Sequence, residues 1–469
     1  MVAGPFAALN FPKRNGTVVG ASALALSHLA IFLDARSISA RGYSDYSCPP
    51  SREYMTRHRA FAWNVSLSLL LNLTLRATGA ITFIFLSRSG WLAEAGSFSL
   101  ALGYLAIFST LFTGLDDFLV REYARSPATT KSLVVTYALV RAFLGLSLGL
   151  AVLSVIGWLS LHSPIEQWAI GIVLLSLLPE AIVATAQAVL TAQHRFGWPL
   201  AITVVGAIVR LGWVGGVWWA NQDISRVVWA WPAGSFVMAG LALICFWPQR
   251  FEIGFEKRWI GPIIQAFPIF SGISLLSALE YQMDVILLSV LLTPADVAIY
   301  SSAAMIMGIL LTFAQAYRMV IYPKLIQALT HQPKATGRLV VLSVLSMGAL
   351  AGFAALVVFI TASHLIRWIY GENLAMAVPV LRVLIWNTIL AFINVPLVRF
   401  LMAGNGQTLI GRLLVVSLIL NVGANFVLVP LYGPLGAAWA RLLSSSVFCG
   451  LVGWAVWERL SHSVLEARI

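Results

Sequence analysis

The sequence predicts an all-α membrane protein, a bundle of about twelve transmembrane helices. Apolar residues make up 59% of its 469 residues and charged residues only 10%, whereas a soluble domain carries roughly 25% charge. The apolar residues also fall into long runs, and strands with open edges cannot satisfy their backbone groups in lipid. This pattern excludes a soluble enzyme, a disordered chain and a disulfide-stapled secreted domain.

From residue 61 onward, about twelve runs are long and apolar enough to cross the hydrocarbon as helices, which takes about 20 residues each. The connections between them are short, which favours a bundle of neighbouring helices. The predicted spans are 61–86, 95–119, 133–160, 168–193, 198–220, 226–247, 262–292, 297–322, 338–363, 376–402, 408–430 and 434–457.

The charges of the connecting loops predict the orientation of the bundle. The net charge is +12, and most loop cations fall on one set of alternate loops. The other set carries Arg88, Arg226, Arg367 and little else. Positively charged loops stay in the cytoplasm. We therefore expect a multi-pass protein of the cell (inner) membrane, with both ends of the twelve-span core in the cytoplasm.

The first sixty residues do not fit this pattern. Residues 16–33 are apolar but short, and Lys13 and Arg14 precede them, as in a signal peptide. A cleaved signal or a thirteenth span would place Arg57 and Arg59 outside, against the charge bias. We therefore expect residues 1–60 to be a dispensable extension, and leave open whether the working protein starts at Met1 or near Met55.

The longest polar stretch of the core, residues 248–258, splits the spans into two sets of six. The predicted parts are the N-terminal extension 1–60, the N-lobe 61–247, a cytoplasmic linker 248–260, the C-lobe 261–457 and a cytoplasmic tail 458–469.

The sequence offers no catalytic or cofactor site. No loop outside the membrane is long enough for a catalytic platform, and neither a G-x-x-x-x-G-K-[ST] phosphate loop nor an H-E-x-x-H zinc motif is present. The three cysteines, Cys48, Cys245 and Cys449, lack metal-binding spacing. We therefore predict no enzyme activity, no cofactor, no metal and no nucleic-acid partner.

Basic residues inside the spans are costly and are functional candidates by default. Arg76 and Arg210 lie mid-span, which suggests either a water-filled cavity or an internal ion pair. Several others lie nearer to helix ends, where a long side chain can reach the headgroups. This interpretation covers Arg141, Arg318, Arg382, Arg399 and Arg441.

Acidic residues in the spans are fewer and more informative. Glu180 follows Pro179, where the helix can break; it is expected either to bind a proton or cation or to pair with Arg76 or Arg210. Glu280 and Asp284 are four residues apart and share a helix face, where they could share a proton. The alternative for Asp284 is a polar group at a helix end or a hydrogen bond between the lobes. Pro262 and Pro268 make the seventh span breakable, and further breaks are expected at Pro323, Pro379, Pro396 and Pro430.

Three segments of the core resemble the oligosaccharide-lipid flippases, the polysaccharide-export branch of the multidrug/oligosaccharidyl-lipid/polysaccharide superfamily. The first reads Asp284-Val-Ile-Leu-Leu-Ser, then Thr293-Pro-Ala-Asp-Val-Ala-Ile-Tyr300-Ser. The second is Tyr322-Pro-Lys-Leu. The third and most specific is Asn421-Val-Gly-Ala-Asn425, then Pro430-Leu-Tyr-Gly433-Pro-Leu-Gly436-Ala-Ala438. The resemblance covers about residues 61–457, although Asp116-Asp117 is unusually acidic for the family.

This resemblance implies two six-helix lobes around a central cavity that opens alternately to each side. The implied cargo is an oligosaccharide on an undecaprenyl-pyrophosphate-type lipid. Arg76, Arg210 and Arg318 would hold the headgroup, since Arg binds phosphate oxygens well. Glu180, Glu280 or Asp284 would couple the movement to H⁺ or Na⁺.

A polysaccharide polymerase and a chain-length regulator are the expected protein partners. Three alternatives stay open. One is a flippase for a peptidoglycan precursor, and another is a drug/cation antiporter of the same superfamily. The third is a membrane polymerase or glycosyltransferase.

Overall fold

The computed structural model describes residues 52–125, 131–193, 195, 197–220, 224–246, 255–331 and 333–466. It divides into two units, residues 1–70 and residues 71–469. The account below concerns the second unit, and within its described residues the chain is helical, without a strand. The expected signal-like segment at 16–33 lies outside the described residues.

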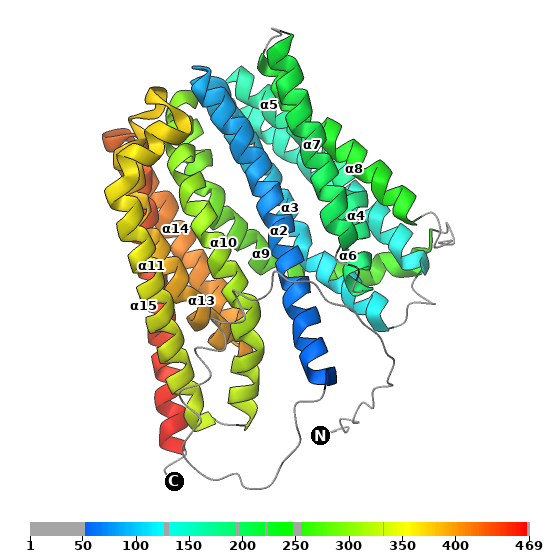
Figure 1. Ribbon diagram of the computed structural model, residues 1–469, viewed down its shortest axis with the longest axis vertical. Helices are drawn as coiled ribbons and strands as arrows, with labels where there is room; N and C mark the ends of the chain where they lie inside the picture. Colours follow the sequence, from blue (N-terminus) through cyan, green and yellow to red (C-terminus); the bar gives the residue numbers. More distant parts are fainter. Residues whose placement is uncertain are drawn as a thin grey trace. The chain divides into compact units, whose positions relative to one another are not determined.

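Twelve of the described segments are long and apolar enough to span a membrane, which confirms the predicted number of spans. The first six spans are built from seven α-helices and a short 3₁₀ turn (Figure 1). These are α2 (Arg52–Arg88), α3 (Leu92–Arg125), α4 (Lys131–Leu159), α5 (Pro164–Leu174), α6 (Leu177–Ala192), α7 (Gly197–Trp219), η2 (Ile224–Trp229) and α8 (Ala230–Phe246).

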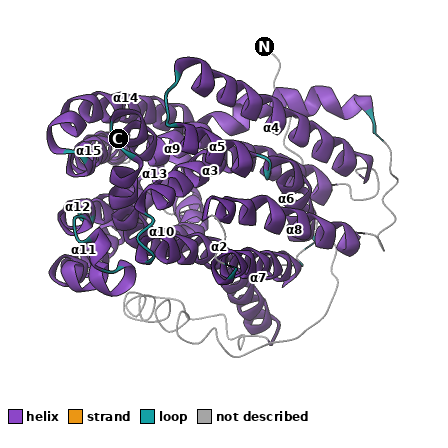
Figure 2. Cartoon of the chain, turned by 90° about the horizontal axis from the view of Figure 1, so that it is seen from above, coloured by secondary structure: helices purple, strands orange, loops and turns teal. Residues whose placement is uncertain are grey.

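The second six spans follow after a short 3₁₀ turn. They comprise η4 (Lys257–Trp259), α9 (Ile260–Leu291), α10 (Pro294–His331), α11 (Pro333–Tyr370), η5 (Glu372–Leu374), α12 (Ala377–Leu384), α13 (Asn387–Ala403), α14 (Gln407–Tyr432) and α15 (Pro434–Glu466). Seen from above, α11–α15 gather on one side and α4–α8 on the other (Figure 2).

Proline explains one broken span but does not break the others. Because Pro179 has no N–H, the carbonyl of Leu175 loses its helical partner, and the fourth span is interrupted between α5 and α6 at that residue. In contrast, α9 runs through Pro262 and Pro268, α10 through Pro323, α13 through Pro396 and α14 through Pro430. The expected breaks at Pro323, Pro396 and Pro430 are wrong, because one missing hydrogen bond does not end a helix that neighbouring helices hold in place.

The two sets of helices pack together mainly through α3, which contacts both α9 and α10. We call the end of the unit where α2 finishes the Arg88 end, and the opposite end the Arg125 end. The largest apolar core joins both sets, with Phe98 of α3 and Leu288 of α9 among its buried members. Toward the Arg125 end the cores are separate, one in α3, α4, α6 and the start of α9, the other in α10, α11 and α13–α15.

Close contacts across the two sets fall at the Arg88 end. A Cβ on Gly96 of α3 would lie 1.8 Å from the carbonyl oxygen of Pro294, the first residue of α10, so only glycine fits there. The Arg88 side chain donates to the carbonyls of Trp368 and Ile369 at the end of α11. The Asn373 amide donates to the Ser87 carbonyl at 3.2 Å. The lobes are therefore closed against each other at this end.

Candidate functional site

The six candidate residues do not form one site. Glu180 and Arg210 lie within the first set of helices, and Glu280 and Asp284 lie within the second. Arg76 of α2 and Arg318 of α10 lie on the sides where the two sets meet, as their contacts below show. Each group has its own partners, so each is considered separately.

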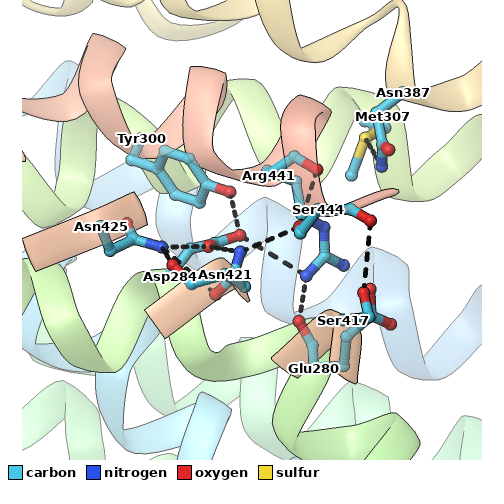
Figure 3. A network of polar contacts seen from close by, with 10 residues as sticks. All are labelled: Glu280, Asp284, Tyr300, Met307, Asn387, Ser417, Asn421, Asn425, Arg441 and Ser444. Atoms are coloured by element: carbon cyan, nitrogen blue, oxygen red, sulfur yellow. Dashed lines mark hydrogen bonds and ion pairs between the residues drawn. The ribbon is translucent and has the colours of Figure 1, made fainter. Parts of the chain in front are cut away.

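Asp284 of α9 is the centre of a buried polar network (Figure 3). Its side chain is 1% exposed. One carboxylate oxygen accepts from the amides of Asn421 at 2.9 Å and Asn425 at 3.1 Å. The other accepts from the Tyr300 hydroxyl at 2.7 Å and lies 3.5 Å from a guanidinium nitrogen of Arg441. Four donors therefore surround this carboxylate.

Arg441 of α15 completes the network. It is buried, donates to the carbonyl of Glu280, and its guanidinium carbon lies 5.4 Å from the centre of the Tyr281 ring. The expectation that Arg441 reaches the headgroups is wrong. Burying a charge is costly unless it is paired, and Arg441 is paired with Asp284. Asp284 is 157 positions away in the chain, so no local sequence pattern reveals the pairing.

The motif of α14 and α15 now has a structural explanation. Asn421 and Asn425 are one turn apart, so both amides face Asp284. Gly433 has φ +61° between the two helices, and a Cβ on Gly436 would lie 2.1 Å from the carbonyl oxygen of Leu428. The glycines thus allow α15 to approach α14 closely enough to place Arg441 beside Asp284.

Glu280 lies one turn before Asp284 and is half-buried. Its carbonyl accepts from Arg441, and its carboxylate interacts electrostatically with the same guanidinium. Glu280 and Asp284 therefore share a helix face, as predicted, with Arg441 as their common cation.

In the first set, Glu180 of α6 lies beside a small pocket. Its carboxylate accepts one hydrogen bond, from the Ser109 hydroxyl at 3.2 Å. The pocket is lined by Ser109, Phe112, Arg141, Gly145, Leu177, Glu180 and Ala181. Within the described residues no ion pair joins Glu180 to Arg76 or Arg210, so Glu180 is the less satisfied of the buried acids.

Arg210 of α7 is buried, and it does not lie with Arg76. It donates to the Ser235 hydroxyl at 2.8 Å, and its guanidinium carbon lies 4.9 Å from the centre of the Trp231 ring. A Cβ on Gly234 would lie 2.5 Å from the Arg210 side chain, so this glycine makes room for it. Arg210 thus fills a slot between α7 and α8.

The unusual acidic pair at the end of α3 has two functions. Asp116 pairs with Arg141 of α4 and accepts from the Tyr137 hydroxyl at 2.7 Å. Arg141 is 7% exposed, so the expectation that it reaches the headgroups is wrong for the same reason as for Arg441. Asp117 instead interacts electrostatically with Arg318 of α10, across the two sets.

The remaining basic residues lie where α10 meets its neighbours. An Arg76 guanidinium nitrogen lies 3.4 Å from the Gly308 carbonyl of α10. Arg318, exposed, is roughly 15 Å further along α10 at 1.5 Å per residue. Arg399 of α13 repels Arg318 electrostatically, and its guanidinium carbon lies 5.8 Å from the centre of the Tyr322 ring.

Arg318 and Arg399 therefore form a pair of like charges at the Arg125 end. Neither is within ion-pair distance of a carboxylate in the described part of the chain. The expectation from the sequence assigns Arg399 to the arginines that reach the headgroups and does not place it with Arg318. The signal in the sequence was position: Arg399 lies near the end of the predicted span 376–402, as Arg318 does in the predicted span 297–322. Both ends are expected on the cytoplasmic side. In these described segments no group of three or more His, Cys, Asp or Glu side chains could hold a metal.

Comparison with known proteins agrees with this geometry. No protein-family model matches the chain. The structure is similar to that of a lipid II flippase, MurJ, in an inward closed conformation (TM-score 0.70, 12% identity, 84% of this chain and 87% of that one). It is also similar to an inward-facing multidrug resistance MATE transporter (TM-score 0.65, 14% identity, 85% of this chain and 98% of that one). The chain therefore shares the fold of these two transporters, of which the second is named as a member of the MOP superfamily.

A sequence relative points in the same direction. Over 283 residues the chain is 24% identical to a probable low-salt glycan biosynthesis flippase, Agl15, of Haloferax volcanii, and the match spans 58% of each protein. The chain thus spans under two thirds of the length of this curated relative. The predicted fold class, an all-α membrane bundle of about twelve helices in two lobes, is confirmed. The three proteins are flippases or transporters by name, and none is named as an enzyme.

Proposed function

We propose that the protein is a flippase that moves a lipid-linked oligosaccharide, on an undecaprenyl-pyrophosphate-type carrier, from the cytoplasmic to the outer leaflet. The fold and the flippase relative support this class. The proposal adds the orientation expected from the loop charges, with the Arg125 end in the cytoplasm. It also retains the predicted parts, namely an N-lobe 61–247, a linker 248–260 and a C-lobe 261–457, flanked by the segments 1–60 and 458–469.

The observation that carries the proposal is the pair Arg318 and Arg399, together with Arg76 of α2, which contacts α10 at Gly308. The three arginines that are buried among the described residues already have partners inside the protein: Arg141 and Arg441 pair with carboxylates, and Arg210 donates to the Ser235 hydroxyl. Guanidinium groups without such partners suit phosphate oxygens, which they bind through charge-assisted hydrogen bonds. A pyrophosphate would meet the pair first and Arg76 as it moves toward the Arg88 end.

This arrangement changes the roles proposed for the headgroup candidates. Arg318 and Arg76 stay, and Arg399 joins them. Arg210 is already held by Ser235 and Trp231 inside the first set, so we propose that it supports α7 and α8 and, through its charge, Glu180.

Among the acids, Glu180 is the best candidate for coupling to a proton. Its carboxylate has one hydrogen-bond donor and borders a pocket. In contrast, the oxygens of Asp284 already have four donors, and Glu280 shares Arg441 with it. H⁺ is therefore favoured over Na⁺, because the two oxygens of a lone carboxylate are too few for a metal ion that prefers several oxygen ligands. A polymerase and a chain-length regulator would act on the product after it reaches the outer leaflet.

The experiment is to delete the gene, extract the lipid-linked sugars and measure which leaflet holds them by digestion with a glycosidase added from outside. Complete repeat units that accumulate in the protected leaflet, while the surface polymer is lost, support the flippase. Repeat units that reach the outer leaflet and stay unpolymerised indicate a polymerase. Unchanged sugars with new drug sensitivity indicate an antiporter, and accumulation of a peptidoglycan precursor indicates a lipid II-type flippase.

A variant with both Arg318 and Arg399 changed to Gln should give the deletion phenotype while the protein stays in the membrane. A matched control is Arg382→Gln, since Arg382 is also an exposed arginine of the second set but contacts the ring of Phe359 instead. Normal export by the double variant would contradict the assignment.

A further inference from the structure

A second buried polar cluster lies at the Arg88 end, away from the residues discussed above. It consists of Tyr104 of α3, His162 and Ser163 before α5, Glu166 of α5, and Ser289 of α9. His162 is 5% exposed and Glu166 1%. Ser289 belongs to the second set of helices and the other four to the first, so this cluster links the lobes where they are closed.

The contacts indicate which atom donates the proton in each hydrogen bond of the cluster. The Ser289 hydroxyl donates to Glu166 Oε1 at 2.6 Å. Since that hydroxyl has one proton, its oxygen must accept at its 2.8 Å contact with His162 Nδ1. His162 Nε2 is then free to accept from the Tyr104 hydroxyl, also at 2.8 Å. A neutral imidazole with its proton on Nδ1 satisfies every member.

Glu166 is held from its own side as well. Its Oε2 accepts from the backbone N–H of Ser163 at 2.9 Å and from the Ser163 hydroxyl at 2.7 Å. The Gln167 amide donates to the His162 carbonyl at 2.9 Å. The loop before α5 is therefore fixed, and the bonds through Ser289 are the ones that break if the lobes separate here.

A second proton on His162 does not fit this cluster. With Nε2 protonated, the imidazolium donates to Tyr104, whose own hydroxyl proton then loses its acceptor inside the protein. Burial also lowers the pKa of His162 in the closed state, although the negative charge of Glu166 opposes this. Separation of the lobes would return the imidazole to water, where its pKa is about 6.5.

We propose that His162, Glu166 and Ser289 form a proton-sensitive latch between the lobes, closed while His162 is neutral and released when it binds a proton from the side of the Arg88 end. Closing the latch expels that proton. Acidification therefore favours opening at this end, between the ordinary pKa of histidine and the lower pKa of the closed state. The device is independent of the cargo and of the coupling role of Glu180.

The residues around His162 indicate that His162 is the group in this cluster that responds to pH. Tyr104 faces it from α3, Glu166 from α5 and the non-titrating Ser289 from α9. The ends of α4 and α8 that pack here carry no ionisable side chain in the described residues. Further charged groups on the packed elements include Glu94 on α3, Arg226 on η2 and Asp284 on α9, the last already paired with Arg441.

The test is a distance measurement by pulsed electron resonance on the full chain in nanodiscs. Cys48, Cys245 and Cys449 are replaced by Ser, and spin labels are placed at Trp158→Cys of α4 and Met376→Cys beside α12. Both positions are exposed, at 83% and 73%. The fraction with the longer distance should rise between pH 7.5 and pH 5.5, by up to about tenfold for one titrating histidine of pKa near 6.5.

His162→Gln keeps a donor and an acceptor but cannot titrate, so its distance distribution should no longer depend on pH. The matched control is His364→Gln, which removes an exposed histidine of α11 outside the cluster and should keep the full response. A pH response in His162→Gln as large as in the parent, or none in the parent, overturns the proposal.

Ser289→Ala keeps the chain foldable without introducing a charge and removes the link between the lobes. It should raise the open fraction already at pH 7.5, and an unchanged fraction there also overturns the proposal. Because no cargo is present, the result is separate from that of the export experiment.

Discussion

Replacing Asp284 tests whether its network is a structural node or an ion site. In Asp284→Asn the charge of Arg441 stays buried without its carboxylate. Both side chains are almost fully buried, at 1% and 4% exposed, so little water can compensate. Removing one partner of a buried pair typically costs about 3–5 kcal/mol. The exposed pair of Arg367 and Glu372 on the same set is the control, since a pair in water contributes at most about 1 kcal/mol.

Thermal unfolding of the purified protein, followed by tryptophan fluorescence, measures the effect. Asp284→Asn and Arg441→Met should each lower the midpoint strongly, and the double variant should lie above at least one single variant, because neither charge is then left alone. Glu372→Gln should leave the midpoint nearly unchanged. Additive losses in the double variant, or a sodium-dependent midpoint of the parent that disappears in Asp284→Asn, would refute the structural role.

Three further predictions follow from single positions. Gly436→Ala places a Cβ against α14 and should lower stability by about 1–3 kcal/mol in the same unfolding assay, whereas Gly450→Ala, with open space around it, should not. Arg318→Lys keeps the charge but loses bidentate contacts, so export of lipid-linked sugar should fall less than in Arg318→Gln; equal loss would contradict phosphate binding. Glu180→Gln should abolish proton-dependent transport in vesicles with a pH gradient while binding of the cargo survives, and unchanged pH dependence would exclude it as the carrier.

The sequence was sufficient for the fold because lipid imposes simple requirements. A span needs about 20 apolar residues, and that count alone located all twelve. Pro179 also marked a real interruption, since its missing N–H acts within one turn. Such local rules do not show which prolines a packed bundle tolerates. The sequence therefore predicted breaks at Pro396 and Pro430 that the structure does not have.

The site was harder to predict because its partners are distant in the chain. Arg441 lies near a helix end, where snorkelling is the usual fate of an arginine. Its actual fate depended on Asp284, Asn421 and Asn425 from two other helices. The motif of α14 contained part of this information, since two amides one turn apart need a common acceptor. Sequence spacing alone could not say that the acceptor was Asp284.

The partners of each arginine separate those with a structural role from those proposed to bind the cargo. Burying a guanidinium without a partner is too costly for a bundle to tolerate, so Arg141 and Arg441 each have a carboxylate and Arg210 has an aromatic ring and a hydroxyl. Neither Arg318 nor Arg399 lies within ion-pair distance of a carboxylate in the described residues, and the two repel each other. The repulsion between two such guanidiniums is reduced when water or an anion lies between them. An anion also makes charge-assisted hydrogen bonds with both groups. Under the proposed function, a phosphate bound at the Arg125 end would therefore offset the cost of holding the two guanidiniums together.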